Sequence, residues 1–240
     1  MARVAIVTGG TRGIGRAISE ALKADGMTVV ANFAGNAEKA RAFTDETGIA
    51  TYQWNVGDHA ETLAGCARVA EEVGPIDVVV NNAGITRDGT LLKMSYEDWA
   101  DVMQVNLGGC FNMAKACFTH MRDQKWGRII NIGSINGQAG QYGQVNYAAA
   151  KSGIHGFTKA LAQEGARFGV TVNAIAPGYI DTDMVAAVPE TVLEKIVAKI
   201  PVGRLGHASE IARGVSFLAS DDGGFVTGST LSINGGQHMY

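Results

Sequence analysis

Short runs of β-branched and other apolar residues alternate along the chain with longer segments of helical periodicity. The short runs predict strands at residues 4–7, 28–31, 50–54, 77–80, 128–132, 171–175 and 230–233. The longer segments predict helices at residues 14–24, 59–73, 95–121, 147–168 and 209–220. This alternation predicts the α/β class, as a Rossmann-type doubly wound parallel sheet of about seven strands with helices on both faces.

The organisation of the chain favours one domain over residues 1–240. No Pro/Ser-rich linker, charge block or repeat divides the sequence. Residues 181–206 lie between the sixth predicted strand and the last predicted helix, and their pattern predicts a helical insertion over the carboxyl edge of the sheet. Because insertions at this place tend to cover substrates, we expect a substrate lid at about 181–206.

Composition and charge narrow the class of protein. Glycine contributes 32 of 240 residues without a three-residue period, and 46% of residues are hydrophobic, which excludes collagen and disorder. Cys66, Cys110 and Cys117 form no CxxC or Cys/His pattern, so we expect neither a metal site nor a disulfide framework. The net charge of −3, without a basic run, argues against a nucleic-acid partner.

The hydropathy pattern also indicates where in the cell the protein is expected. No apolar stretch approaches 18 residues, and the first apolar run is too short for the core of a signal peptide. We therefore expect no membrane partner and a cytoplasmic protein, in keeping with an odd number of unpatterned cysteines.

A glycine-rich turn follows the first predicted strand, with the sequence Thr8-Gly9-Gly10-Thr11-Arg12-Gly13-Ile14-Gly15. Glycines here would permit a tight turn and a close approach of the backbone to a pyrophosphate, which the next helix N-terminus attracts. Three residues separate Gly9 from Gly13, so the spacing differs from G-x-G-x-x-G. A plain strand-to-helix turn remains the alternative.

The region after the second predicted strand bears on the choice of cofactor. An NAD site would use a carboxylate there to accept the ribose 2′-OH, but residues 29–36 contain no acid. Arg12 supplies a cation for a 2′-phosphate, with Lys39 or Arg41 as further partners. The sequence therefore favours NADP(H) over NAD, the alternative being that Arg12 is a solvated loop charge.

Three further groups of residues point to carbonyl chemistry. Tyr147 and Lys151 are four residues apart and share one helix face, where the ammonium would favour the phenolate form and so assist proton transfer. Ser134 follows the fifth predicted strand and offers a hydroxyl to a carbonyl. Residues 81–84, Asn-Asn-Ala-Gly, end the fourth strand at the same edge. Taken singly, each fits ordinary surface or turn chemistry as well.

In combination, these motifs resemble the short-chain dehydrogenase/reductase family, in its NADP-dependent ketoreductase branch, over residues 2–236. The resemblance rests on the 8–15 turn, residues 81–84, Asn106, Ser134, Tyr147 with Lys151, Pro177-Gly178 and Asn234-Gly235-Gly236.

The resemblance implies a role for each matching residue. Tyr147 would protonate the carbonyl oxygen as hydride arrives from the nicotinamide, Ser134 would polarise that oxygen, and Lys151 would assist Tyr147 and hold the ribose. Asn106 would hold a water in the proton relay to Lys151, the alternative being a core Asn that kinks its helix. The implied cofactor contacts are Gly9, Arg12, Gly13, Ile14, Gly15, Asn32, Asn55, Val56, Asn82, Ala83, Gly84, Pro177, Gly178, Ile180 and Thr182. Asn55 departs from the family, which often has Asp at that position.

The resemblance also implies a substrate class, a 3-oxoacyl thioester. It favours NADPH-dependent reduction of acetoacetyl-CoA to (R)-3-hydroxybutyryl-CoA for polyhydroxyalkanoate synthesis. The alternative is reduction of 3-oxoacyl groups on acyl carrier protein for fatty acid synthesis. Amide and phenol side chains suit a short polar acyl thioester, so we expect substrate contacts from Asp88, Gln138, Gln141, Tyr142, Gln144 and Tyr179. Solvated loop positions are the alternative for the glutamines.

Two further expectations concern partners. Carrier-protein enzymes of the family present paired basic residues to the carrier, whereas this chain has Lys125 and Phe168, with Arg167 adjacent, which favours CoA. The family also implies a homotetramer formed through the helices at 95–121 and 147–168. A non-catalytic NADP-binding regulator is least favoured, because Ser134, Tyr147 and Lys151 are all present.

Overall fold

The computed structural model describes residues 2–182 and 190–239. Each run that the sequence predicts as a strand is a strand. The strands are β1 (Val4–Thr8), β2 (Thr28–Phe33), β3 (Ala50–Gln53), β4 (Ile76–Asn81), β5 (Gly127–Ile132), β6 (Val170–Pro177) and β7 (Thr230–Ile233). They pair in parallel as a seven-stranded sheet in the order β3-β2-β1-β4-β5-β6-β7, which confirms the predicted Rossmann-type fold.

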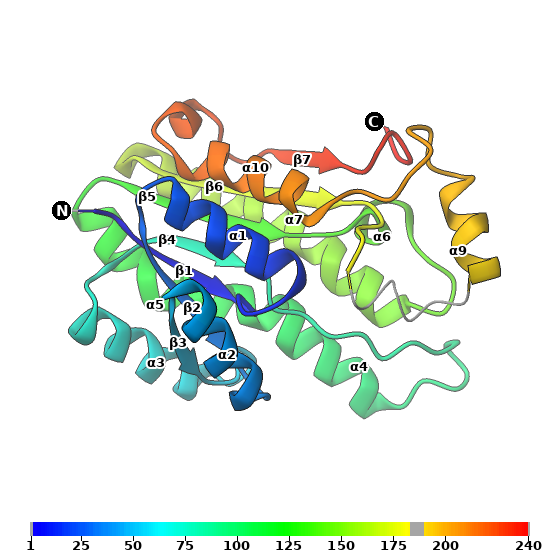
Figure 1. Ribbon diagram of the computed structural model, residues 1–240, viewed down its shortest axis with the longest axis horizontal. Helices are drawn as coiled ribbons and strands as arrows, with labels where there is room; N and C mark the ends of the chain where they lie inside the picture. Colours follow the sequence, from blue (N-terminus) through cyan, green and yellow to red (C-terminus); the bar gives the residue numbers. More distant parts are fainter. Residues whose placement is uncertain (1, 183–189, 240) are drawn as a thin grey trace.

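Helices connect the strands and cover both faces of the sheet (Figure 1). The α-helices are α1 (Gly13–Ala24), α2 (Ala37–Thr47), α3 (His59–Glu72), α4 (Tyr96–Met103), α5 (Gly109–Asp123), α6 (Ile135–Ala139), α7 (Val145–Gly165), α9 (Glu190–Val197) and α10 (Ala208–Ala219). A π-helix, η1 (Gln104–Gly108), joins α4 to α5, and the 3₁₀ turns are η2 (Ala166–Phe168) and η3 (Asp222–Phe225).

Successive strand residues alternate between two apolar cores, as the period of two in a strand requires. In β1, Ala5 and Val7 pack with α1, α2 and α10 on one face, while Ile6 packs with α3, α5 and α7 on the other. All five residues of β1 and all eight of β6 are buried. The central strands are therefore apolar throughout because helices cover them on both sides.

The strand order places a crevice at the carboxyl edge of the sheet. The chain runs outward through β2 and β3 on one side of β1 and then crosses to β4 on the other side. Connections leave β1 and β4 in opposite directions, and ligands of doubly wound sheets bind outside the strand ends at such a point. The glycine-rich turn after β1 and residues 81–84 at the end of β4 meet here.

The structure refines the predicted helix at 95–121. The helix is continuous from Tyr96 to Asp123, but five residues in its middle, Gln104–Gly108, form a π-helix that contains Asn106. Such bulges occur frequently at functional sites. The apolar pattern does not predict this change of winding, because it spans only five residues inside an otherwise regular helix.

Helices α2 and α6 were not predicted, and the predicted lid is described in part. Helix α2 buries only Ala40 and Phe43 at the edge of the fold, so its sequence carries a weak apolar period. Residues 183–189 of the predicted lid at 181–206 lie outside the described residues. Within the rest of that segment, α9 is helical, and Asp181 and Gly206 are joined by a backbone hydrogen bond.

Candidate active site

The turn after β1 is built from glycines in conformations that other residues rarely adopt. Gly9 and Gly13 have φ values of 60° and 50°. A Cβ on Gly15 would lie 2.2 Å from the carbonyl oxygen of Gly9, so the first turn of α1 packs directly on the loop backbone. The turn therefore exposes backbone rather than side chains at the crevice, while Ile14 packs partly into the core.

Side chains at the end of β4 hold this turn in place. Thr8 Oγ1 accepts hydrogen bonds from the backbone N–H groups of Asn82 and Ala83, both at 3.0 Å. Asn82 Nδ2 returns hydrogen bonds to the carbonyl oxygens of Thr8 and Gly9 at 2.9 and 3.2 Å. Asn82 therefore fixes the glycine turn, and Ala83 lies beside it, partly buried.

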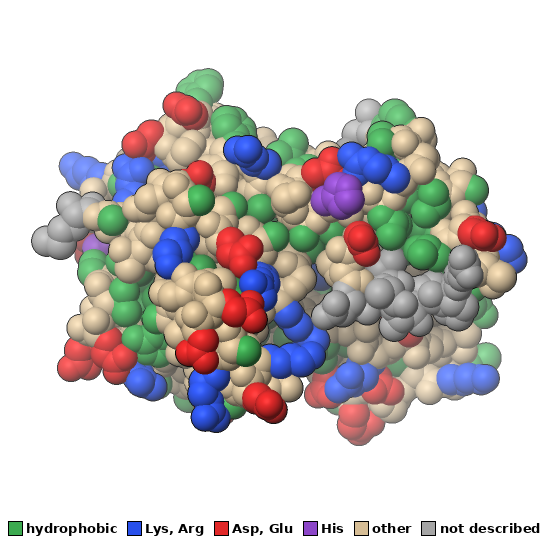
Figure 2. All heavy atoms as spheres, in the orientation of Figure 1, with side chains coloured by type: hydrophobic (Ala, Val, Ile, Leu, Met, Phe, Trp, Pro, Cys, Tyr) green, Lys and Arg blue, Asp and Glu red, His purple; other side chains and the backbone are tan. Residues whose placement is uncertain are grey.

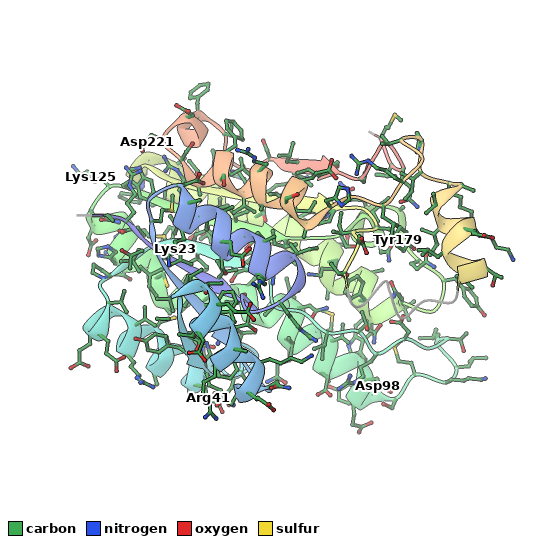
Figure 3. All side chains as sticks on the ribbon, viewed as in Figure 1. Lys23, Arg41, Asp98, Lys125, Tyr179 and Asp221 are labelled. Carbon is green, nitrogen blue, oxygen red and sulfur yellow. The ribbon has the colours of Figure 1, made fainter. Side chains whose placement is uncertain are left out.

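The residues at this turn fit a dinucleotide. Arg12 is the N-cap of α1 and makes no side-chain capping bond, so the helix presents uncapped N–H groups that suit a pyrophosphate. Within residues 2–182 and 190–239, no carboxylate pairs with the exposed Arg12, whereas Arg16 is held by Glu20 and Glu46 at 2.8 Å each. Figure 2 shows Lys and Arg side chains gathered beside the hollow on this face, and Figure 3 places Arg41 on α2 below it.

The residues predicted beside the adenosine half of a cofactor are held by local contacts. Asn32 is buried at the end of β2 and donates to the carbonyl of Trp54 at 3.0 Å, which ties β2 to the end of β3. Asn55 Oδ1 accepts from Gly57 N at 3.0 Å and closes a turn. Val56 is buried against Gly109. These residues give the rim of the crevice a fixed shape.

A buried lysine marks the opposite side of the crevice. Lys151 is only 3% exposed, and its Nζ donates to the carbonyl of Ile132 at 2.7 Å. The same Nζ lies 5.7 Å from the centre of the Tyr147 ring, as the four-residue spacing on α7 predicts. A buried ammonium needs polar partners, so this position is suited to a proton relay or a bound hydroxyl.

Ser134 follows β5 and is the N-cap of the short helix α6. Its Oγ accepts a hydrogen bond from Asn136 N at 3.1 Å and caps α6. Since this bond uses an oxygen lone pair, the hydroxyl hydrogen stays free to donate. Helix α6 is packed tightly on α7, because a Cβ on Gly137 would lie 2.7 Å from the carbonyl carbon of Lys151.

Asn106 connects the π-helix to the segment after β4. Its Oδ1 accepts from Ile85 N at 2.8 Å and its Nδ2 donates to Ile85 O at 3.0 Å, so both ends of the amide are engaged. A Cβ on Gly84 would lie 3.2 Å from Asn106 Oδ1 and 3.6 Å from Lys151 Nζ. The site therefore brings Asn106, Gly84 and Lys151 close together.

The wall next to Tyr147 is built by two loops that bind each other. Gln144 accepts from Asn136 Nδ2 and donates to Asp88, each at 2.9 Å. Asn146, fully buried, donates to the carbonyls of Arg87 and Asp98 at 2.9 and 3.2 Å. Figure 3 shows Asp98 on α4, below this wall. Asp88 and Gln144 thus form part of the wall itself.

The remaining predicted substrate residues differ in how far their side chains are buried or hydrogen-bonded within the protein. Gln138 Nε2 donates to Ser232 Oγ at 3.2 Å, which ties α6 to β7. Gln141 and Tyr142 are exposed, with Tyr142 86% accessible. Tyr179 is half-buried, and burial raises the pKa of its phenol, which keeps the hydroxyl protonated.

Residues after β6 return over the glycine turn. Gly178 N donates to Ile233 O at 2.9 Å, and a Cβ on Gly178 would lie 2.8 Å from the Cα of Asn234, which follows β7. Ile180 is buried. The Thr182 methyl lies 3.6 Å from the position that a Cβ on Gly13 would take. Thr182 therefore lies beside the glycine turn, while Pro177 is buried at the end of β6.

Three groups of this site were missed by sequence reasoning. Thr8 was noted only as the start of the turn, yet its hydroxyl joins β1 to β4. Asn146 immediately precedes Tyr147 and accepts the Tyr147 N–H at 2.7 Å. The Ile132 carbonyl receives Lys151. The signal in the sequence for Asn146 was a polar residue immediately before a candidate proton donor. The roles of Thr8 and of the Ile132 carbonyl depend on tertiary contacts.

The described part of the chain has neither a cluster suited to a metal ion nor a helix suited to crossing a membrane. Across residues 2–182 and 190–239, no three His, Cys, Asp or Glu side chains gather in a way that would hold a metal ion. Nor does any helix described there combine the length and apolar character needed to cross a bilayer.

Comparisons with known proteins identify the family of this chain. The model of a family described as "Enoyl-(Acyl carrier protein) reductase" matches residues 9–238. The chain is 61% identical to an acetoacetyl-CoA reductase of Rhizobium meliloti (strain 1021) over 240 residues, which cover 100% of both chains. It is 61% identical to the acetoacetyl-CoA reductase of Paracoccus denitrificans, over 99% of both chains. A 3-oxoacyl-[acyl-carrier-protein] reductase of Escherichia coli (strain K12) is 46% identical, over 99% of this chain and 98% of its own. The chain is therefore an oxidoreductase that belongs to the short-chain dehydrogenase/reductase family.

Proposed function

We propose that this chain reduces acetoacetyl-CoA to (R)-3-hydroxybutyryl-CoA with NADPH and thereby supplies polyhydroxyalkanoate synthesis. The observation that carries the proposal is the buried Lys151, whose ammonium lies between the Ile132 carbonyl and the Tyr147 ring. Full-length relatives at about 60% identity that are named acetoacetyl-CoA reductase support the choice of substrate.

In this proposal each residue of the site has a separate role in the reduction of a ketone. A bound nicotinamide cofactor would supply the hydride that adds to the carbonyl carbon. Tyr147 donates the phenolic proton to the carbonyl oxygen, and Ser134 donates its free hydroxyl hydrogen to the same oxygen. Lys151 stabilises the phenolate left on Tyr147 until a proton returns. Asn106 holds the Ile85 backbone beside this relay through two hydrogen bonds.

The preference for NADPH rests on charge. Residues 28–36 carry no acidic side chain that would repel a 2′-phosphate, and Arg12 is exposed without a described carboxylate partner. The glycine turn and the N-terminus of α1 would hold the pyrophosphate. Residues Gly178, Ile180 and Thr182 would cover the nicotinamide end.

Free side chains near the crevice suit a short polar acyl thioester. Gln138 and Gln144 have partners within the protein, so Tyr179, Gln141 and Tyr142 are the side chains left to meet the substrate. The protonated Tyr179 hydroxyl would donate to the thioester carbonyl. A carrier-bound 3-oxoacyl substrate is the second candidate, supported by the 46% identical relative and by Arg167 beside Phe168.

Exposed apolar residues support a homotetramer. On the helices expected to form subunit contacts, Phe111 is 52% and Val145 is 42% exposed. The three cysteines are free and buried, which fits work in the reducing cytoplasm.

The experiment that tests the role of the site is replacement of Tyr147 by Phe. The variant loses only the ionisable hydroxyl, so we expect kcat for acetoacetyl-CoA reduction to fall at least about 10²-fold. Tyr96→Phe, at an exposed position on α4, is the matched control and should keep wild-type kcat. Retention of activity by the Tyr147→Phe enzyme would refute the proton-donor assignment.

A further inference from the structure

The carboxylate of Glu210 on α10 accepts hydrogen bonds from donors in one loop, residues 204–207. Its Oε1 and Oε2 accept the two terminal nitrogens of Arg204 at 2.7 and 2.8 Å. Oε2 also accepts the backbone N–H of His207 at 2.8 Å, and Arg204 donates to the carbonyl of Leu205 at 2.9 Å. The bonds from Arg204 and then His207 lower the pKa of Glu210 to about 2, so the carboxylate is charged at neutral pH. Loop 204–207 is thus fixed at both ends.

This loop is paired to the backbone that follows β6. Gly206 N donates to the carbonyl of Tyr179 at 2.9 Å, and Asp181 N donates to the carbonyl of Gly206 at 2.8 Å. The two bonds lie on either side of Ile180, which is buried. A Cβ on Gly206 would come within 2.6 Å of Ile180 Cδ1, so the two segments fit closely. Any shift of residue 206 therefore moves residues 179–181.

The segment so held faces the glycine turn. Thr182, directly after it, lies against Gly13, and Gly178, directly before it, is bonded to Ile233 at the end of β7. Figure 3 shows Tyr179 in this region, between the end of the sheet and α9. A cavity of about 100 Å³ lies under the segment and is lined by Tyr179, Ile180, Arg204, Glu210, Asn234 and Gly235, among others.

We propose that Glu210 and Arg204 are positioning residues for the cofactor site. Through Gly206 they hold the backbone of residues 179–181 at the distance from the glycine turn that a bound nicotinamide cofactor requires. Neither side chain needs to touch the cofactor. The inference rests on the proposed function for the identity of the ligand, but the chain of contacts from Glu210 to residue 181 stands without it.

The ion pair itself is suited to positioning, while Glu210 also caps the N-terminus of α10 through the His207 N–H. Side chains of Arg204 and Glu210 are 48% and 40% exposed, and exposed ion pairs add little to the free energy of unfolding. Arg68 and Glu72 on α3 form a matched pair, with side chains 64% and 45% exposed and a 2.7 Å hydrogen bond. In both pairs the glutamate has a second donor, His207 N for Glu210 and Tyr52 Oη for Glu72.

The test compares Glu210→Ala and Glu210→Gln with the control Glu72→Ala. In the cofactor-free protein, amide hydrogen exchange is measured at Asp181 and Gly206, and NADPH affinity is then measured by fluorescence titration. We expect Glu210→Ala to exchange faster at both amides and to bind NADPH about tenfold or more weakly. Glu210→Gln keeps an acceptor for His207 N and should fall between Glu210→Ala and wild type. Glu72→Ala should match wild type in both measurements.

Two results would overturn the proposal. One is unchanged exchange and an NADPH affinity within about twofold of wild type in Glu210→Ala. The other is faster exchange without weaker binding, which would make the pair purely structural. If Glu210→Ala does not fold, the same criteria apply to Glu210→Gln. Failure of the proposed function would show differently, as a wild-type protein that does not bind NADPH or reduce acetoacetyl-CoA.

Discussion

Replacement of Gly15 by Ala tests whether the glycine turn needs direct contact between backbone segments. In the first turn of a helix, Ala would ordinarily be favoured over Gly by up to about 1 kcal/mol. Here the added Cβ would lie 2.2 Å from the Gly9 carbonyl oxygen and 2.6 Å from Asn82 Nδ2. Ordinary contact begins at 3.4 Å, so the Gly9 carbonyl must retreat by about 1.2 Å. That carbonyl is bonded to Asn82, which limits its retreat.

The expected cost is that of an overpacked core, about 1–3 kcal/mol. In a chain of this length each kcal/mol lowers Tm by about 2–4 °C, so we expect a fall of about 2–12 °C. NADPH affinity should fall about tenfold or more, since a shift of this size misplaces the turn that holds the pyrophosphate. Thermal denaturation and fluorescence titration measure the two effects.

Gly156→Ala is the matched control for this prediction. Gly156 lies on the exposed side of α7, and a Cβ there would meet no atom within 4 Å. The control should therefore gain up to about 1 kcal/mol and bind NADPH as wild type does. If Gly15→Ala behaved like Gly156→Ala, the reasoning about close backbone contact would be refuted.

Three further predictions concern charge, pH and packing. Arg12→Ala should weaken NADPH binding about tenfold and leave the affinity for NADH unchanged. The control Arg122→Ala, at the far edge of the sheet, should change neither affinity. An equal loss of affinity for both cofactors in Arg12→Ala would contradict the 2′-phosphate contact. Burial, Lys159 and Lys151 lower the pKa of His155 in the folded protein. As pH falls below about 6.5, the imidazole is therefore protonated in the unfolded chain before it is protonated in the folded protein, and the free energy of unfolding decreases. His155→Gln should flatten the fall of Tm between about pH 7 and 5; an unchanged slope would count against this. Asn146→Ala removes the donor to the carbonyls of Arg87 and Asp98, so the free energy of unfolding in denaturant titrations should fall by about 1–3 kcal/mol and kcat should decrease. Wild-type values of both quantities would contradict this prediction.

The fold and the placement of Tyr147 beside Lys151 could be predicted because their signals are local in the sequence. Each strand shows its own apolar run, and the order of strands and helices fixes a parallel sheet. The Tyr147–Lys151 spacing places both side chains on one helix face without knowledge of the rest of the chain. Glycine at positions 9, 13 and 15 likewise reports a local backbone requirement.

Features that depend on distant partners could not be predicted. The family resemblance implied a relay role for Asn106, but not that Ile85, 21 positions earlier, takes both ends of its amide. Gln138 and Gln144 look free in the sequence, but Ser232 and Asp88 engage them across 94 and 56 positions. The same holds for Glu210, whose function in our proposal depends on a contact between Gly206 and Tyr179.

The most direct test of the proposed function is a comparison of kcat/KM for purified protein across cofactors and substrates. Acetoacetyl-CoA with NADPH is compared with the same substrate and NADH, with longer 3-oxoacyl-CoA thioesters, and with a carrier-bound 3-oxoacyl group. The proposal predicts that acetoacetyl-CoA with NADPH is reduced far faster than with NADH, that the product is the (R)-3-hydroxy thioester, and that kcat/KM falls with chain length. Comparable rates with NADH, or a kcat/KM that rises with chain length or carrier attachment, would contradict it.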